Sequence, residues 1–373
     1  MSFKNLLNHW KYPSEESRLR KILLAPLGLL SFFYGWAVSL RVYLYRQNFF
    51  TVRSLACQVV SVGNITLGGT GKTPFVILIA EMLKRKELRV GILSRGYKGN
   101  FRGPFQAVSD GQETLLKSSQ AGDEPYLLSR KLKGIPVIVG KKRWQSGQYA
   151  IDRFQTEILI LDDGFQYLAL KRDVNLLLID AARPFGNGYL FPRGVLREPL
   201  SELSRADAII LTKAGGCDNL QILKNNLTKT VKGIPVFQVE YAPGEIQVAG
   251  KEISFPPEYL GGKTVLAFSG IAQPGSFQQT LQQLRARIVE FAVFPDHHRY
   301  RPQEMEGLAH KARELGVEAL VTTEKDLARC HGLEPRAIPL WGVSIQHVFL
   351  GNDRLLFEEF LLAKLSLAGR GDF

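Results

Sequence analysis

A glycine-rich segment between a predicted strand and a predicted helix constrains the fold of this chain more than any other feature. An apolar run at residues 57–62 is typical of a buried strand, and it leads through GNITLGGTGKTP at residues 63–74 into the helix-like stretch FVILIAEMLKRK. In such a turn, successive backbone N–H groups can surround phosphates at the positive end of the helix dipole. The match to G-x-x-x-x-G-K-[ST] departs at Thr66, where the pattern has glycine, and Gly68 with Gly69 restores the flexibility. The segment predicts a P-loop that holds ATP.

Side chains in and near this loop predict the chemistry of the site. Lys72 can reach the β- and γ-phosphates and act in catalysis, and the Thr73 hydroxyl can hold Mg²⁺. A second apolar run, ILILDD, should place Asp162 and Asp163 at the carboxyl end of a neighbouring strand, where open α/β sheets bind ligands and where a P-loop needs an acidic group for Mg²⁺. The residues that we expect to bind the nucleotide are Thr66, Leu67, Gly68, Gly69, Thr70, Gly71, Lys72 and Thr73.

The remaining apolar runs predict an α/β fold. Short β-rich segments at 89–93, 157–162, 174–180 and 208–212 alternate with helix-compatible stretches, which favours a doubly wound, mostly parallel, P-loop NTPase-like sheet. A second series at 264–270, 288–294 and 318–324, with helical patterns at 277–287 and 302–315, predicts a second, smaller α/β lobe.

The chain is therefore expected to have three parts. They are an N-terminal hydrophobic helical segment at 1–50, a P-loop core at 51–245 and the second lobe at 246–373. The segment 241–263 is rich in glycine and proline, and we interpret it as the hinge between the core and the lobe.

The N-terminal segment predicts contact with a membrane. Residues 22–40 include no charged side chain, a length of about 28 Å as a helix, and Lys or Arg residues border them on both sides. The pattern favours a retained anchor that spans the bilayer or lies in its surface, and a buried core helix is the alternative. The formal net charge of +13 indicates an anionic partner, but no nucleic-acid-binding motif accompanies it, so nucleic acid is not expected.

Several strings, taken together, resemble the tetraacyldisaccharide 4'-kinase family, which phosphorylates the lipid A precursor of Gram-negative bacteria. They cover nearly the whole chain, and they are SVGNITLGGTGKTP, LSRGYKG (93–99), GDEP (122–125), LDDGFQ (161–166), PRGVLREP (192–199), FSGIAQPGSF (268–277), DHH (296–298) and TTEKD (322–326). The resemblance implies transfer of the γ-phosphate of ATP to the 4'-hydroxyl of an acylated glucosamine disaccharide 1-phosphate. It also implies work at a membrane surface, on the cytoplasmic face of the bacterial inner membrane.

The resemblance further implies roles for residues outside the P-loop. Asp123 would accept the proton of the acceptor hydroxyl, with His297 hydrogen-bonded behind it, and Glu124 would assist at the metal. Arg95 and Lys98 are expected to bind phosphates of the substrate or the nucleotide. Without the resemblance, a helix cap would be the simpler interpretation of Asp123. Likewise, His297 would read as an ordinary loop histidine.

Two observations bear on alternatives. The family's aspartate motif usually continues DDGFQH, whereas this chain has Tyr167 at the histidine position. A membrane-attached P-loop ATPase switch of the MinD or ParA type is the alternative function, but such proteins usually carry a signature lysine where this chain has Leu67.

Overall fold

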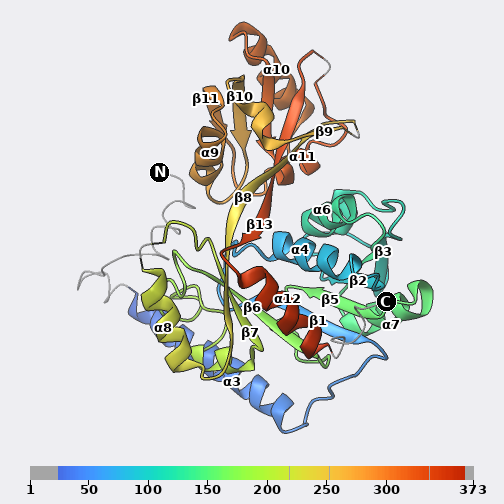
Figure 1. Ribbon diagram of the computed structural model, residues 1–373, viewed down its shortest axis with the longest axis vertical. Helices are drawn as coiled ribbons and strands as arrows, with labels where there is room; N and C mark the ends of the chain where they lie inside the picture. Colours follow the sequence, from blue (N-terminus) through green and yellow to red (C-terminus); the bar gives the residue numbers. More distant parts are fainter. Residues whose placement is uncertain (1–23, 218, 252, 336, 366–373) are drawn as a thin grey trace. The chain divides into compact units, whose positions relative to one another are not determined.

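The computed structural model describes residues 24–365, except for 218, 252 and 336, so the first part of the predicted N-terminal segment, residues 1–23, lies outside the described residues (Figure 1). The described chain forms two compact units, each of which is discontinuous in sequence. Unit 1 contains the described residues of 24–95, 140–240 and 348–365, and unit 2 contains those of 96–139 and 241–347.

Unit 1 is built on a parallel sheet in the order β8-β7-β6-β1-β5-β2. The strands and helices alternate along the chain as the apolar runs predict. The elements of unit 1 are α3 (Ala25–Arg46), β1 (Gln58–Asn64), α4 (Lys72–Lys84), β2 (Val90–Ser94), α7 (Arg143–Phe154), β5 (Ile158–Asp162), β6 (Val174–Asp180), the 3-10 helix η1 (Leu200–Arg205), β7 (Ala208–Thr212), α8 (Leu220–Thr230), the first part of β8 (Val236–Val248) and α12 (Asp353–Lys364).

Apolar side chains cover both faces of this sheet. Alternate residues of β6 and β7 pack with Leu227 of α8 in one buried cluster. Elsewhere in the unit, Phe75 of α4 meets Phe357 of α12 edge to face, with ring centroids 5.7 Å apart. The strand β1 is therefore buried along nearly its whole length, which fixes the loop that follows it at the carboxyl edge of the sheet.

Unit 2 contains a second parallel series, β11-β10-β12-β13, which confirms the predicted second set of strands. Its elements are β3 (Phe105–Ser109), α5 (Ser118–Ala121), α6 (Asp123–Lys131), most of β4 (Val137–Gly140), the second part of β8, β9 (Ser254–Phe255), the 3-10 helix η2 (Pro257–Leu260), β10 (Thr264–Ser269), α9 (Pro274–Gln283), β11 (Arg287–Val293), α10 (Pro302–Glu314), β12 (Ala319–Thr323), α11 (Glu324–Arg329) and most of β13 (Leu340–Phe349).

The units group the chain differently from the predicted parts 51–245 and 246–373. Residues 96–139 belong to unit 2, because α6 packs against α11, and the C-terminal helix α12 belongs to unit 1, because Phe357 packs against Phe75 and Phe237. A boundary between the units falls at 240/241, where the predicted hinge 241–263 begins, but the backbone there is not a loop. Strand β8 continues without interruption to Val248, and Gly244 lies within it.

Helix α3 lies along unit 1 and has two contrasting faces. Ser31, Gly35 and Val42 are buried, whereas the opposite face exposes large apolar side chains: Leu29, Leu30, Phe32, Phe33, Trp36, Leu40 and Tyr43. By length and composition alone, its 22 residues would suffice to cross a membrane.

Candidate functional site

The predicted P-loop has the expected strand-loop-helix geometry. Gly71 adopts a left-handed conformation with φ of 80° and caps α4, which begins at Lys72. The following Thr73 is 3% exposed. The backbone N–H of Leu67 donates to the carbonyl of Val195 at 2.7 Å, so a second segment holds the loop in place.

The paired carboxylates follow β5, where the sequence places them. In the parallel register of β1 and β5, Asp162 lies opposite Val62, next to the strand that carries the P-loop. Asp162 is 2% exposed, and Ser94 donates to its Oδ2 atom at 3.4 Å. Arg143 donates to the carbonyl oxygen of Asp162 at 3.1 Å, and its guanidinium lies 5.1 Å from the ring centre of Tyr167. Tyr167 therefore takes part in holding this turn.

The Asp163 carboxylate lies between two cationic side chains. The backbone of Asp163 is left-handed, with φ of 52°, and its Oδ1 atom lies 3.6 Å from Lys72 Nζ. Arg197 grips the same carboxylate with two hydrogen bonds, at 2.8 and 3.1 Å, and also donates to Asn64 at 3.1 Å. Burial acts to raise the pKa of Asp163, but Lys72 and Arg197 outweigh it and lower that pKa to about 2. The carboxylate is thus ionised at neutral pH and holds two cations beside the phosphate loop.

In unit 2, the structure brings together Asp123 and His297, as predicted. Asp123 is the first residue of α6, and its Oδ2 atom lies 3.4 Å from Nδ1 of His297. Ser118 donates to the other carboxylate oxygen at 2.9 Å. The sequence reasoning missed Arg329, whose Nε donates to Asp123 Oδ2 at 2.9 Å. Burial acts to raise the pKa of Asp123, but the charge and hydrogen bond of Arg329, together with the hydrogen bond from Ser118, hold it well below its usual range.

A pocket of about 260 Å³ opens above this cluster, with Asp123 in its lining. Cationic side chains surround the carboxylate there, which suits an anionic ligand; they are Lys98, Lys117, Arg299 and Arg329. Of the two predicted phosphate-binding residues, Lys98 lines this pocket, whereas Arg95 lies exposed at the end of β2 in unit 1. The predicted metal ligand Glu124 lies 3.5 Å from Lys325, within unit 2.

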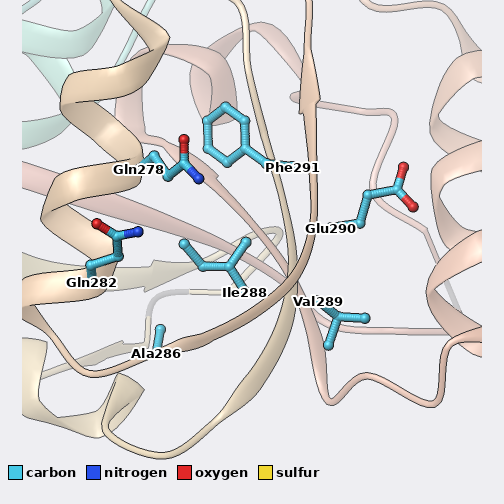
Figure 2. A pocket seen from close by; sticks show the side chains of 7 residues that line it. All are labelled: Gln278, Gln282, Ala286, Ile288, Val289, Glu290 and Phe291. Atoms are coloured by element: carbon cyan, nitrogen blue, oxygen red, sulfur yellow. The ribbon is translucent and has the colours of Figure 1, made fainter.

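Another hollow, of about 340 Å³, lies between α9 and β11. Figure 2 shows Gln278 and Gln282 of α9 beside Ile288 and Phe291 of β11. None of the described residues that line it is cationic, and the carboxylate of Glu290 forms an ion pair with Lys311 at 2.6 Å. The pocket around Asp123 is therefore better suited to an anionic ligand than this hollow.

Comparison with known proteins agrees with this geometry. The family model described as LpxK, tetraacyldisaccharide-1-P 4'-kinase, matches residues 20–366. A tetraacyldisaccharide 4'-kinase from Desulfatibacillum aliphaticivorans is 42% identical over 344 residues, which cover 92% of this chain and 93% of that protein. One from Syntrophus aciditrophicus is 42% identical over 330 residues, 86% of this chain and 88% of that protein. The crystal structure of the "apo" form of LpxK from Aquifex aeolicus in complex with ATP is similar with a TM-score of 0.74 and 31% identity, and the match covers 92% of this chain and 99% of that one.

Proposed function

The chain belongs to the tetraacyldisaccharide-1-phosphate 4'-kinase family, and from that premise we propose how its residues carry out the reaction. The enzyme uses ATP to phosphorylate the 4'-hydroxyl of a tetraacyldisaccharide 1-phosphate in lipid A biosynthesis. The ATP-bound relative, which matches over nearly the whole chain, favours this kinase over a switch ATPase of the MinD or ParA type.

In this proposal, the nucleotide is bound by unit 1. Backbone N–H groups of residues 66–73 surround its phosphates, and Lys72, released from Asp163, neutralises charge on the γ-phosphate. The residues also fit Mg²⁺, because the buried Thr73 hydroxyl and the buried Asp162 carboxylate are oxygen donors beside the loop, and Mg²⁺ takes its other ligands from phosphates and water. Bound there, Mg²⁺ would neutralise charge that develops on the phosphates during transfer. Asp163 and Glu124 form ion pairs with Arg197 and Lys325, so each would have to release its cation to bind the metal.

The acceptor hydroxyl is oriented by Asp123. The oxygen of the acceptor hydroxyl forms the new bond to the γ-phosphorus while the bond between that phosphorus and the bridging oxygen of ADP breaks. The proton of the hydroxyl passes to the Asp123 carboxylate. Because the pKa of this carboxylate is low, it is a weak base, and proton transfer follows bond formation instead of preceding it. Orientation of the hydroxyl is then the main contribution of Asp123, and the cationic lining of its pocket accepts an anionic glycolipid.

We propose that α3 lies in the plane of the membrane surface instead of crossing the bilayer. Its contacts with unit 1 extend over much of its length: Ser31 donates to the carbonyl of Leu190 at 2.8 Å, Tyr34 to that of Arg197 at 2.9 Å, and Arg46 pairs with Glu202 at 3.1 Å. A helix that spanned the membrane would have to give up these polar contacts or draw them into hydrocarbon.

The opposite face of α3 suits the boundary between headgroups and acyl chains. Phe32, Phe33 and Trp36 are 69%, 56% and 62% exposed, respectively, and Phe191 adds a further exposed ring beside Tyr34. An apolar stripe of this kind buries itself in the interface between headgroups and acyl chains. The membrane face on which the enzyme meets ATP and this acceptor would be the cytoplasmic face of the inner membrane.

The single observation that carries the proposed function is the P-loop with Lys72 and Asp163 in a chain that matches this family along nearly its whole length. The test is to incubate the purified protein with γ-labelled ATP and the tetraacyldisaccharide 1-phosphate in mixed micelles. We expect label at the 4' position, and none with Lys72→Ala. Release of labelled phosphate that does not depend on the glycolipid would instead indicate an ATPase.

A further inference from the structure

Arg329 occupies the centre of the Asp123 cluster, and all three of its guanidinium nitrogens have partners there. Its side chain is 5% exposed. The Nε atom donates to Asp123 at 2.9 Å, and the Nη1 atom donates to Asp326 at 2.8 Å and to the carbonyl of Gly270 at 3.0 Å. The Nη2 atom lies 3.2 Å from Nδ1 of His297. The planar guanidinium group of Arg329 therefore links α6, α11 and the loop that carries His297.

We propose, on the basis of the kinase function proposed above, that Arg329 is the positioning residue of this site: it fixes the orientation of the Asp123 carboxylate and holds His297 as the Nε2–H tautomer. Asp123 and His297 are then positioned by Arg329 and not only by their contact with each other. The chemistry of the contacts supports each half of this assignment.

The tautomer follows from the chemistry of donors and acceptors. A guanidinium N–H can only donate, so Nδ1 of His297 must accept when it bonds to Arg329. The same atom then has no proton to give to Asp123, from which it lies 3.4 Å, at the long end of hydrogen bonding. A neutral imidazole in this state carries its proton on Nε2. His297 is 35% exposed and lines the pocket, so this proton is the one that the imidazole offers to a ligand.

The orientation of Asp123 follows from the geometry on both of its oxygens. Arg329 holds one oxygen and Ser118 holds the other, each at 2.9 Å. The other basic side chains around the pocket, Lys98, Lys117 and Arg299, line it without a hydrogen bond to this carboxylate among those of the described residues. The guanidinium thus provides the nearest fixed positive charge to Asp123.

If Arg329 served only to form a structural ion pair with Asp326, its other two nitrogens would not need to contact Asp123 and His297. Asp326 is fully buried, and it also accepts hydrogen bonds from the backbone N–H of Gly270 at 3.0 Å and from the Thr323 hydroxyl at 2.7 Å. Only Nη1 of Arg329 serves Asp326, and the remaining two nitrogens are directed to the pair that we place at the acceptor hydroxyl.

The kinetic test compares Arg329→Lys and Arg329→Met with the matched control Lys131→Met. Lys131 forms a partly buried ion pair with Glu324 at 3.2 Å and so joins the same two helices, α6 and α11, without touching Asp123 or His297. We expect kcat to fall about tenfold in Arg329→Lys, which keeps the positive charge but loses the planar set of three nitrogens. In Arg329→Met we expect a fall of about 10²-fold, because misplacement of catalytic groups by about 1 Å has that effect. The KM for ATP should stay unchanged in both variants, and Lys131→Met should keep the wild-type kcat. A kcat within threefold of wild type in Arg329→Met, or an equal loss in Lys131→Met, would overturn the proposal.

A second measurement does not depend on turnover, and it uses Arg329→Lys in case Arg329→Met does not fold. Ring-¹⁵N-histidine NMR spectra of wild type, with His297→Gln to assign the resonance, report which imidazole nitrogen carries the proton. We expect an unprotonated Nδ1 and a protonated Nε2 in wild type at neutral pH, and a mixture of tautomers in Arg329→Lys. A proton on Nδ1 in wild type would contradict the proposal even if the protein phosphorylates its glycolipid. Absence of glycolipid phosphorylation by a wild type with the expected spectrum would instead contradict the kinase function.

Discussion

At the scale of single residues, the lysine that we propose to bind phosphate lies beside a carboxylate. Lys72 lies 3.6 Å from Asp163, which also holds Arg197, so the ammonium group has a partner before the nucleotide arrives. ATP offers the lysine a competing partner of higher negative charge. The three side chains therefore act as a group, and the effect of substituting one depends on the others.

Lys72→Ala and Thr73→Ala should each lower phosphoryl transfer by orders of magnitude, with a melting temperature near that of wild type. In the proposed mechanism Lys72 acts on phosphate charge and the Thr73 hydroxyl acts on Mg²⁺, so the substitutions should affect the chemical step more than packing. Turnover with ATP and glycolipid, together with thermal unfolding, measures both effects. Turnover close to wild type in both variants would remove the P-loop from the mechanism.

The glycine that precedes the P-loop should be intolerant of a methyl group. A Cβ atom at Gly63 would lie 2.5 Å from Cβ and 2.7 Å from the backbone N of Phe165, in the turn after Asp163. Gly63→Ala must therefore displace this turn, and we expect a loss of about 1–3 kcal/mol in stability and weaker ATP binding. Gly275→Ala is the control, because its Cβ would have no neighbour within 4 Å. Equal melting temperatures for the two variants would contradict the packing argument.

At the scale of elements, α3 shows why a hydrophobic helix need not be a separate anchor. Tyr34 donates to the carbonyl of Arg197, the residue that grips Asp163, and Arg41 donates to the carbonyl of Gln166 at 3.2 Å. Deletion of the helix would thus disturb the phosphate site as well as remove apolar surface. Substitutions on its exposed face separate the two effects.

Phe33→Ser with Trp36→Ser should raise the apparent KM for the glycolipid and leave the KM for ATP unchanged. Both side chains are more than half exposed, so the fold loses little, whereas binding to the membrane interface loses apolar area. Leu355→Ser on α12 is the control, because this residue is also exposed, at 66%, but lies outside the apolar face of α3. Vesicle flotation and titration of both substrates measure the effect. An unchanged lipid KM and full membrane binding would show that this face does not contact lipid.

The sequence predicted β1, β2, β5, β6, β7, β10, β11 and β12 to within one or two residues, because continuous apolar runs and turn residues mark them. It did not predict β8 or β13. It did not predict the course of residues 241–248. The glycine- and proline-rich composition of 241–263 was interpreted as a hinge, but a Cβ atom at Gly244 would lie 2.5 Å from the Ser344 hydroxyl, so this glycine allows close packing within a strand.

The candidate site was predictable only where its residues are close in sequence or belong to a recognisable string. Lys72, Asp162 and Asp163 follow from strand-end motifs, and Asp123 and His297 follow from the family resemblance. Arg329 lies 206 positions from Asp123, and its place in the site depends on how α6 packs against α11. No local pattern contains that information. Arg197 belongs to the string PRGVLREP, but its contact with Asp163 follows only from the fold.

At the scale of the whole molecule, the two discontinuous units should respond separately to core substitutions. Phe268 is fully buried in β10, where its ring contacts Tyr300 at 5.4 Å between centroids. Phe268→Ala should destabilise unit 2 by about 3–5 kcal/mol and leave the strands of unit 1 protected. Because α6 packs against α11, residues 105–131 should lose protection together with 264–329.

Amide hydrogen exchange followed by mass spectrometry resolves these segments, and Phe75→Ala is the matched control in unit 1. Phe75 is also fully buried, and it contacts Phe349 and Phe357. This variant should expose β1 and β6 to exchange while residues 105–131 keep their protection. If residues 105–131 instead exchange faster in Phe75→Ala than in Phe268→Ala, they unfold with unit 1. The helix that carries Asp123 would then be stabilised by the phosphate-binding sheet and not by the lobe that carries His297 and Arg329.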